Sequence, residues 1–133
     1  MSNSTEGIVR EVLECVGNTN RAFRDAAIEL RRMPQVENVA TALEIMNYDS
    51  GPLIEGYVDA ELSDGNGICW RLDVTWDSNS WNIRGVLERN SASGTDILER
   101  MPPQNVPEIA QLPEALARAA GKLLSLRPQE LTE

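Results

Sequence analysis

Acidic side chains are the groups in this 133-residue sequence that could do chemistry. Asp and Glu together number 21, whereas histidine is absent and only two cysteines occur. Without histidine the chain cannot form a serine or cysteine nucleophile system of the triad type or a histidine-containing zinc site, and two cysteines cannot form a four-cysteine site. The sequence also contains no P-loop, dinucleotide fingerprint or nucleophile elbow. Any catalysis would have to use a pair of carboxylates as acid and base.

One segment partly matches a calcium-binding loop. Asp77, Asn79 and Glu88 occupy positions 1, 3 and 12 of that motif. Positions 5 and 6, however, are Trp81 and Asn82, where the motif requires an oxygen ligand and a glycine. We therefore expect no metal site in this segment, and no metal or organic cofactor elsewhere in the chain.

Alternating apolar and polar residues in the middle of the chain predict the strands that would position the carboxylates. In residues 53–62, 68–76 and 81–89 apolar and polar side chains alternate, which is typical of half-buried antiparallel strands. Residues 38–48 form a weaker candidate strand, and the pattern leaves open whether 96–101 add a fifth. The alternation places six candidate partner-binding residues on one polar face: Glu55, Tyr57, Asp59, Glu61, Asp73 and Glu88. The tryptophans fall on the opposite, apolar face: Trp70, Trp76 and Trp81.

The turn at residues 77–80 predicts how the last two of these strands pair. Pairing Trp76 with Trp81 across this turn places Asp73 opposite Arg84. Opposite charges that face each other across a strand pair stabilise a sheet by a few tenths of a kcal/mol. The charges therefore support this register.

The turn at residues 63–67 predicts the preceding pairing by the same reasoning. Pairing Leu62 with Ile68 places Asp59 opposite Arg71, again an aspartate facing an arginine. With both aspartates engaged in salt pairs, the glutamates of the polar face would be freer to bind a partner. Tyr57 lies among them and is the expected aromatic anchor.

Two helices flank the sheet in the sequence. Residues 5–33 carry apolar side chains at spacings of three and four, which predicts one long helix that Pro34 ends. Its expected buried stripe consists of Val9, Leu13, Val16, Phe23, Ala27 and Leu30. Residues 113–126 predict a second helix that begins at Pro113, and three prolines argue against regular structure over 102–107. We expect a single α+β domain, residues 1–133, with an N-terminal helix, a four- to five-stranded antiparallel meander over 38–101 and a C-terminal helix, both helices packing on the tryptophan-bearing face.

The charge distribution indicates the class of partner. The formal net charge is −9, and residues 36–90 alone carry ten acidic residues against three arginines, a net charge of −7. Phosphate backbones and anionic lipid surfaces repel such a chain, so nucleic acid and membrane are disfavoured. An acidic sheet face with an aromatic anchor is typical of a protein that binds a basic protein surface.

The expected location is the cytoplasm. The N-terminus has neither the basic region nor the apolar region of a secretory signal, and no apolar run approaches the length of a membrane span. Without a secretory context, we expect Cys15 and Cys69 to be reduced core thiols rather than a disulfide.

These features favour a binding role over catalysis. In size, charge and lack of catalytic motifs the chain resembles immunity proteins that neutralise bacterial toxins, although it shares no motif with them; the leading hypothesis is such an inhibitor of a basic partner, acting as a monomer or a homodimer. One alternative is a secretion-type chaperone, a class that resembles this chain in having helices around a strand meander. Another is a carboxylate-based enzyme or a small-ligand pocket between the helices and the sheet.

Overall fold

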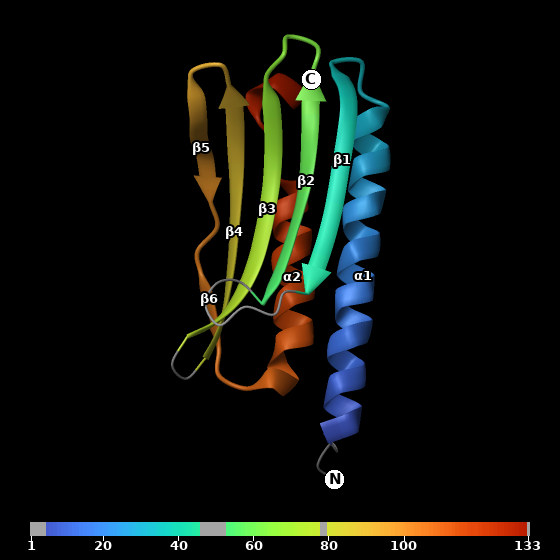
Figure 1. Ribbon diagram of the computed structural model, residues 1–133, viewed down its shortest axis with the longest axis vertical. Helices are drawn as coiled ribbons and strands as arrows, with labels where there is room; N and C mark the ends of the chain where they lie inside the picture. Colours follow the sequence, from blue (N-terminus) through green and yellow to red (C-terminus); the bar gives the residue numbers. More distant parts are fainter. Residues whose placement is uncertain (1–4, 46–52, 78–79, 133) are drawn as a thin grey trace.

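The computed structural model describes residues 5–45, 53–77 and 80–132. The elements follow one another as α1 (Thr5–Arg31), β1 (Val36–Ile45), β2 (Ile54–Leu62), β3 (Gly67–Asp77), β4 (Ser80–Ser91), β5 (Gly94–Arg100), β6 (Gln104–Val106) and α2 (Leu112–Ser125), with short 3-10 helices at Ile109–Gln111 and Gln129–Leu131 (Figure 1). The predicted α+β class is confirmed, with an N-terminal helix, an antiparallel meander and a C-terminal helix. The weak first strand is present and ends at Ile45; the last three residues of its predicted range lie outside the described residues.

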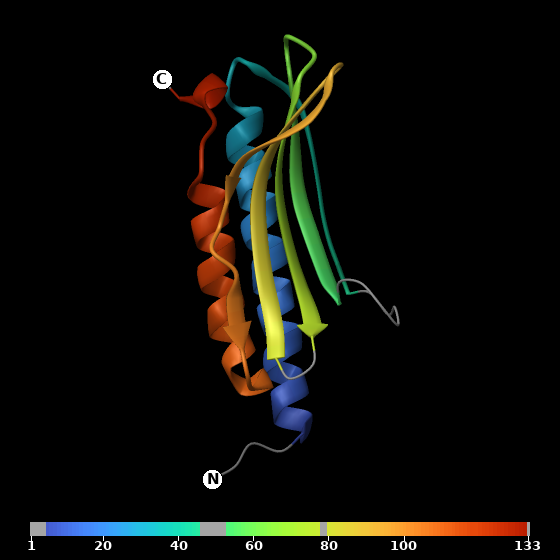
Figure 2. The same cartoon turned by 90° about the vertical axis from the view of Figure 1, so that its left-hand side faces the viewer.

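The sheet has one covered and one open face. Its strands lie in the order β1-β2-β3-β4-β5, and every pairing is antiparallel. Both helices pack on the same side of it (Figure 2). We call this side the inner face and the opposite side the outer face. The fifth strand that the sequence left open is present as β5.

A sixth strand contradicts the expectation that prolines exclude regular structure over residues 102–107. β6 consists of Gln104–Val106 and pairs with Trp81–Ile83 of β4. A proline lacks the N–H group that a ladder needs, but the three residues of β6 lie between prolines and keep theirs. They can therefore pair with β4 on the same side as β5, nearer the start of β4.

Burial follows the alternation of the sequence. Along β2, buried residues alternate with half-buried or exposed ones through the whole strand. The inner-face side chains of the sheet join those of α1 and α2 in one hydrophobic core, whose largest fully buried members are Trp70, Phe23, Leu30, Ile68 and Leu72. The sheet therefore depends on the helices for the burial of its apolar side.

Trp70 lies in the middle of this core, on the central strand β3. Its indole is 1% exposed, and its Nε1–H donates to the carbonyl of Leu126 at 2.9 Å, just beyond α2. The guanidinium of Arg127 lies 5.8 Å from the centroid of the same ring. One side chain thus ties the sheet to the segment that follows the last helix.

The prediction that all three tryptophans are buried is wrong for Trp76. This residue is 49% exposed and packs against Trp81, which is half-buried, with a ring-centroid distance of 4.8 Å. Alternation fixes which side of a strand a residue faces but not whether a helix reaches that far.

The expected apolar stripe of α1 is also partly wrong. Val9 and Leu13 are 50% and 54% exposed. The buried positions follow a shifted phase: Cys15, Thr19, Phe23, Ala26, Ala27 and Leu30. The hydroxyl of Thr19 is buried because it donates to the carbonyl of Cys15, four residues earlier, at 2.8 Å.

The two cysteines are free and buried, as expected. The Cys15 thiol lies between the helices and donates to the carbonyl of Pro113 at 3.2 Å. Cys69, in contrast, lies on the outer side of β3, so the sheet separates the two sulfur atoms. Neither helix in the described part of the chain is long and apolar enough to cross a membrane.

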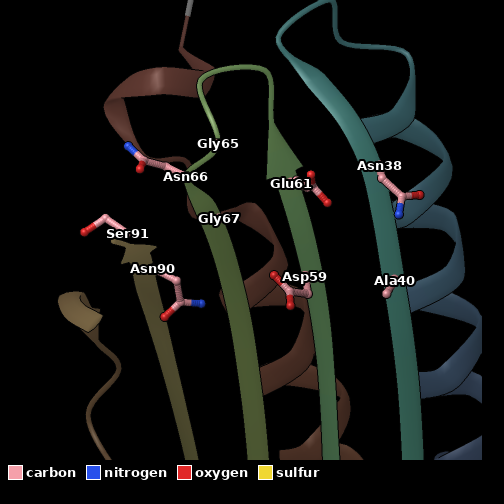
Figure 3. A pocket seen from close by; sticks show the side chains of 9 residues that line it. All are labelled: Asn38, Ala40, Asp59, Glu61, Gly65, Asn66, Gly67, Asn90 and Ser91. Atoms are coloured by element: carbon pink, nitrogen blue, oxygen red, sulfur yellow. The ribbon is translucent and has the colours of Figure 1, made fainter. Parts of the chain in front are cut away.

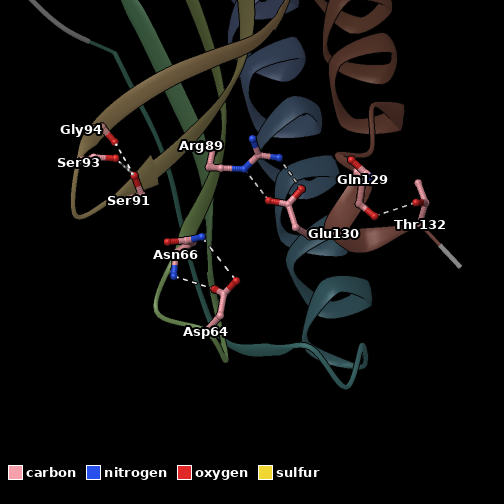
Figure 4. A network of polar contacts seen from close by, with 9 residues as sticks. All are labelled: Asp64, Asn66, Arg89, Ser91, Ser93, Gly94, Gln129, Glu130 and Thr132. Atoms are coloured by element: carbon pink, nitrogen blue, oxygen red, sulfur yellow. Dashed lines mark hydrogen bonds and ion pairs between the residues drawn. The ribbon is translucent and has the colours of Figure 1, made fainter.

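A polar clamp fixes the C-terminal segment to the sheet. Arg89 of β4 donates from Nε and Nη2 to the two carboxylate oxygens of Glu130, at 2.5 and 2.6 Å (Figure 4). This bidentate bond holds the pKa of Glu130 below its ordinary value. The amide of Gln35 donates to the Glu130 carbonyl at 3.2 Å, so the end of the chain is also tied to the start of β1.

The position of Trp70 predicts a large stability effect. Trp70→Ala should lower the free energy of unfolding by about 3–5 kcal/mol, because it removes a fully buried indole and its hydrogen bond. Urea unfolding followed by circular dichroism measures the change. Trp76→Ala is the matched control and should cost clearly less, since half of that ring is already exposed. Equal losses for the two variants would contradict the described packing.

Candidate protein-binding face

The outer face brings together all six residues that the sequence selected. The pairing of β2 with β3 aligns Glu55 with Asp73 and Tyr57 with Arg71. It also aligns Asp59 with Cys69, and Cys69 is aligned with Glu88 on β4. Glu61 lies at the upper end of β2, opposite Gly67. Strand residues that face each other share a side of the sheet, so these groups form one continuous polar surface.

The predicted register of β3 and β4 is confirmed, but that of β2 and β3 is wrong by two residues. Ile68 pairs with Ala60 rather than Leu62. The loop is shorter than expected, because the Asp64 carboxylate accepts a hydrogen bond from the backbone N–H of Asn66 at 2.9 Å and Gly65 adopts a φ of 92°. These two features close a three-residue loop over residues 63–65.

The corrected register changes which acids are paired. Arg71 forms ion pairs with Glu88 at 3.3 Å and with Glu55 at 3.8 Å, and not with Asp59 as expected. Two of the three glutamates that we expected to be free are thus engaged. Arg71 remains 46% exposed, and Tyr57 beside it is 36% exposed, so both can still contact a partner.

A buried thiol lies among these charges. Cys69 is 3% exposed and is flanked by Asp59 on β2 and Glu88 on β4. Burial, followed by the nearby carboxylate of Asp59, raises the pKa of the thiol to about 11. Cys69 is therefore a protonated packing residue at neutral pH and not a nucleophile.

Asp73 is half-buried and faces Arg84, as predicted from the register. Burial raises the pKa of its carboxyl, and the charge of Arg84 opposes that rise. One of its carboxylate oxygens, like the hydroxyl of Thr75, is buried and has no hydrogen-bond partner within the part of the chain that the structure describes. Asp73 is therefore poorly placed to contact a partner directly.

A hollow of about 360 Å³ opens at the upper end of the outer face (Figure 3). Its lining comes from four strands and one loop: Asn38, Ala40, Asp59, Glu61, Gly65, Asn66, Gly67, Asn90 and Ser91. Asp59 and Asn90 point toward each other across β3, where Gly67 carries no side chain (Figure 3). A Cβ atom at Gly67 would lie 3.7 Å from both the Asp59 carboxylate and the Asn90 Cβ. The absence of a side chain at Gly67 therefore creates the floor of the hollow.

Two carboxylates in the hollow are available to a ligand. Neither Asp59 nor Glu61 forms an ion pair within 4 Å among the described residues, and both side chains are exposed. Partial burial raises the pKa of Asp59; Arg71 opposes this rise and Glu61 adds to it. A cation placed here would relieve an unfavourable charge rather than compete with an existing pair.

Sequence reasoning missed the amide residues of the hollow. Asn38, Asn66 and Asn90 come from different segments, and only the strand registers bring them together. Their signal in the sequence was weak, because asparagine near a strand end is also typical of a turn. Among the described residues, no group of three or more acidic or cysteine side chains could hold a metal ion. Asn79, one of the calcium-loop positions, lies outside the described residues.

Comparison with protein-family models, curated proteins and solved structures gives no match for this chain. Its function therefore has to be argued from the geometry of the outer face.

The raised pKa of Asp59 predicts that replacing this carboxyl with a neutral amide stabilises the protein, by an amount that depends on pH. The ionised form of this carboxyl opposes folding. The stabilisation that the carboxyl contributes is therefore complete below its unfolded-state pKa of 3.8 and is lost as the pH rises through the higher folded-state pKa. Asp59→Asn should therefore have a higher thermal midpoint than the wild type at neutral pH.

That advantage should disappear in acid, where both proteins are uncharged at position 59. Thermal melts across this pH range measure it, with Asp25→Asn on the exposed side of α1 as the control. An Asp59→Asn protein that is less stable than the wild type at neutral pH would show that the carboxylate has a structural partner.

Proposed function

We propose that this protein binds a basic protein surface through its outer face, with the hollow receiving a cationic side chain. The observation that carries the proposal is the pair of carboxylates, Asp59 and Glu61, which have no ion-pair partner among the described residues and lie beside a polar hollow on a sheet face that neither described helix covers. The leading form of the function is an inhibitor of immunity type, which neutralises a basic partner such as a toxin.

The chemistry of the hollow suits an arginine or lysine. A guanidinium or ammonium group can donate hydrogen bonds to the carboxylates of Asp59 and Glu61. Asp59 is partly buried already, which strengthens its attraction to an incoming cation. The polar lining fits an apolar ligand less well.

Two further features of the sheet region support binding of a basic protein: an exposed aromatic side chain and a net negative charge. Tyr57 lies beside the Arg71 ion pairs and is exposed enough to be desolvated by a partner, as tyrosines at binding hot spots often are. The net negative charge of the sheet region would accelerate encounter with a basic protein.

The alternatives from the sequence receive less support. A chaperone would hold its client through an exposed apolar groove, whereas carboxylates and amides line the hollow of the outer face. A small-ligand site between the helices and the sheet would need space that is taken by buried side chains such as Trp70, Phe23 and Leu123. We place the proposed inhibitor in the cytoplasm, where two free buried thiols stay reduced.

The test uses a displayed random-peptide library and two charge-matched variants. Asp59→Asn/Glu61→Gln removes both carboxylates of the hollow. Glu11→Gln/Glu29→Gln removes two exposed carboxylates of α1 and produces the same net charge. Peptides selected on the wild-type protein should be rich in arginine or lysine and should bind the α1 variant with unchanged affinity.

The same peptides should lose at least about tenfold in affinity for the Asp59→Asn/Glu61→Gln protein, because two charge-assisted contacts disappear. Gly67→Leu should produce a similar loss by filling the hollow, since nothing in the backbone there requires glycine. Selected peptides that carry no cation, or that bind all variants equally well, would overturn the proposal.

A further inference from the structure

Asn66 and Gly67, which line the hollow, form a sequence that is prone to chemical change. Among the asparagines of the chain, only Asn66 is followed by glycine. An asparagine side chain can be attacked by the backbone nitrogen of the next residue, and glycine favours this reaction because it has no Cβ atom to hinder the approach. Figure 3 shows the two residues at the point where the loop enters β3.

Little holds the two reacting groups in place. Among the described residues, the Asn66 carboxamide makes one hydrogen bond, from Nδ2 to the Asp64 carboxylate, and at 3.5 Å it is weak. Gly67 and Asn90 form the end pair of the β3–β4 ladder, and such ends open most readily. A Cβ atom at Gly67 would meet nothing closer than 3.7 Å, so the backbone there is uncrowded. The carboxamide can therefore rotate onto the Gly67 nitrogen.

One hydrogen bond of the loop favours this nitrogen as a nucleophile. The reaction begins when hydroxide from solvent removes the proton of the Gly67 N–H. The negative charge then spreads onto the carbonyl oxygen of Asn66, which belongs to the same peptide group. That oxygen accepts a hydrogen bond from the backbone N–H of Leu62 at 2.8 Å. A donor to the charged form stabilises it, so the loop promotes ionisation of this peptide group.

The reaction balances with water as the other reactant. The Gly67 nitrogen forms a bond to Cγ of Asn66, the bond from Cγ to Nδ2 breaks, and Nδ2 leaves as ammonia with a proton from water, which regenerates hydroxide. Water then opens the five-membered imide ring. Cleavage between the nitrogen and Cγ gives aspartate, and cleavage between the nitrogen and the main-chain carbonyl carbon gives isoaspartate. Each product carries one more negative charge than asparagine.

We infer that Asn66 is a site of spontaneous deamidation and that its aspartate product strengthens the attraction of the hollow for a cation. Asn66 lines the hollow together with Asp59 and Glu61, so the change adds a third carboxylate to it. The modification itself follows from the loop alone, whereas its effect on cation binding rests on the proposed function. The two parts therefore have separate measurements.

Mass spectrometry of peptides from protein aged in mildly alkaline buffer measures the modification. Asn66 should deamidate at least about tenfold faster than Asn90, which is followed by serine. Gly67→Ala should slow the reaction at Asn66 at least about tenfold, because the added Cβ hinders ring closure yet fits the fold. Circular dichroism checks that the variant folds. An Asn66 that reacts no faster than Asn90, or equally fast in Gly67→Ala, would overturn the modification site.

The effect on the hollow is measured with the cationic peptides selected on the wild-type protein. Asn66→Asp should bind them at least about threefold more tightly, because a third carboxylate attracts the cation. Asn18→Asp is the charge-matched control on the exposed side of α1 and should leave the affinity unchanged. Equal affinity of Asn66→Asp and the wild type would overturn this effect alone. Selected peptides without a cation would overturn the proposed function and this effect with it, but not the modification site.

Discussion

Everything in this fold depends on the burial of one face of the sheet around Trp70. The indole lies on the central strand beneath both helices and is bonded to the backbone just after α2. Two helices cover only one side of the six-stranded sheet, so the other side has to carry polar side chains. The acidic outer face is therefore the counterpart of the tryptophan-centred core, because the same period of two places apolar residues inward and carboxylates outward.

The class, order and facing of the elements could be predicted from the sequence because they follow from periodicity. Alternation over β2, β3 and β4 is clear, and the pairing of Trp76 with Trp81 fixed the β3–β4 register correctly. The reach of the helices could not be predicted in this way. Val9, Leu13 and Trp76 have the spacing of core residues, yet they are exposed, because coverage depends on where neighbouring elements end.

The sequence could predict which residues lie on the candidate face, but not which of them form ion pairs with one another. All six selected residues lie on the outer face, since facing requires only the alternation. Which acids are free depends on the register of β2 and β3, which a three-residue loop shifts by two positions. The shift moves Arg71 away from Asp59 to a position opposite Tyr57, where it pairs with Glu55, while Glu88 reaches it from β4. The shift also places Gly67 opposite Glu61, and the missing side chain of Gly67 opens the hollow.

In this fold the outer face of the sheet is open to solvent, whereas the helices close the inner face. Paramagnetic relaxation of side-chain methyl groups by a soluble gadolinium chelate measures this directly in solution. Val58 and Ala60, both fully buried, should be protected, whereas Ala40 and Ala42 on the outer side of β1 should relax strongly. Equal protection of the two pairs in dilute protein would show that the outer face is covered and would contradict the account.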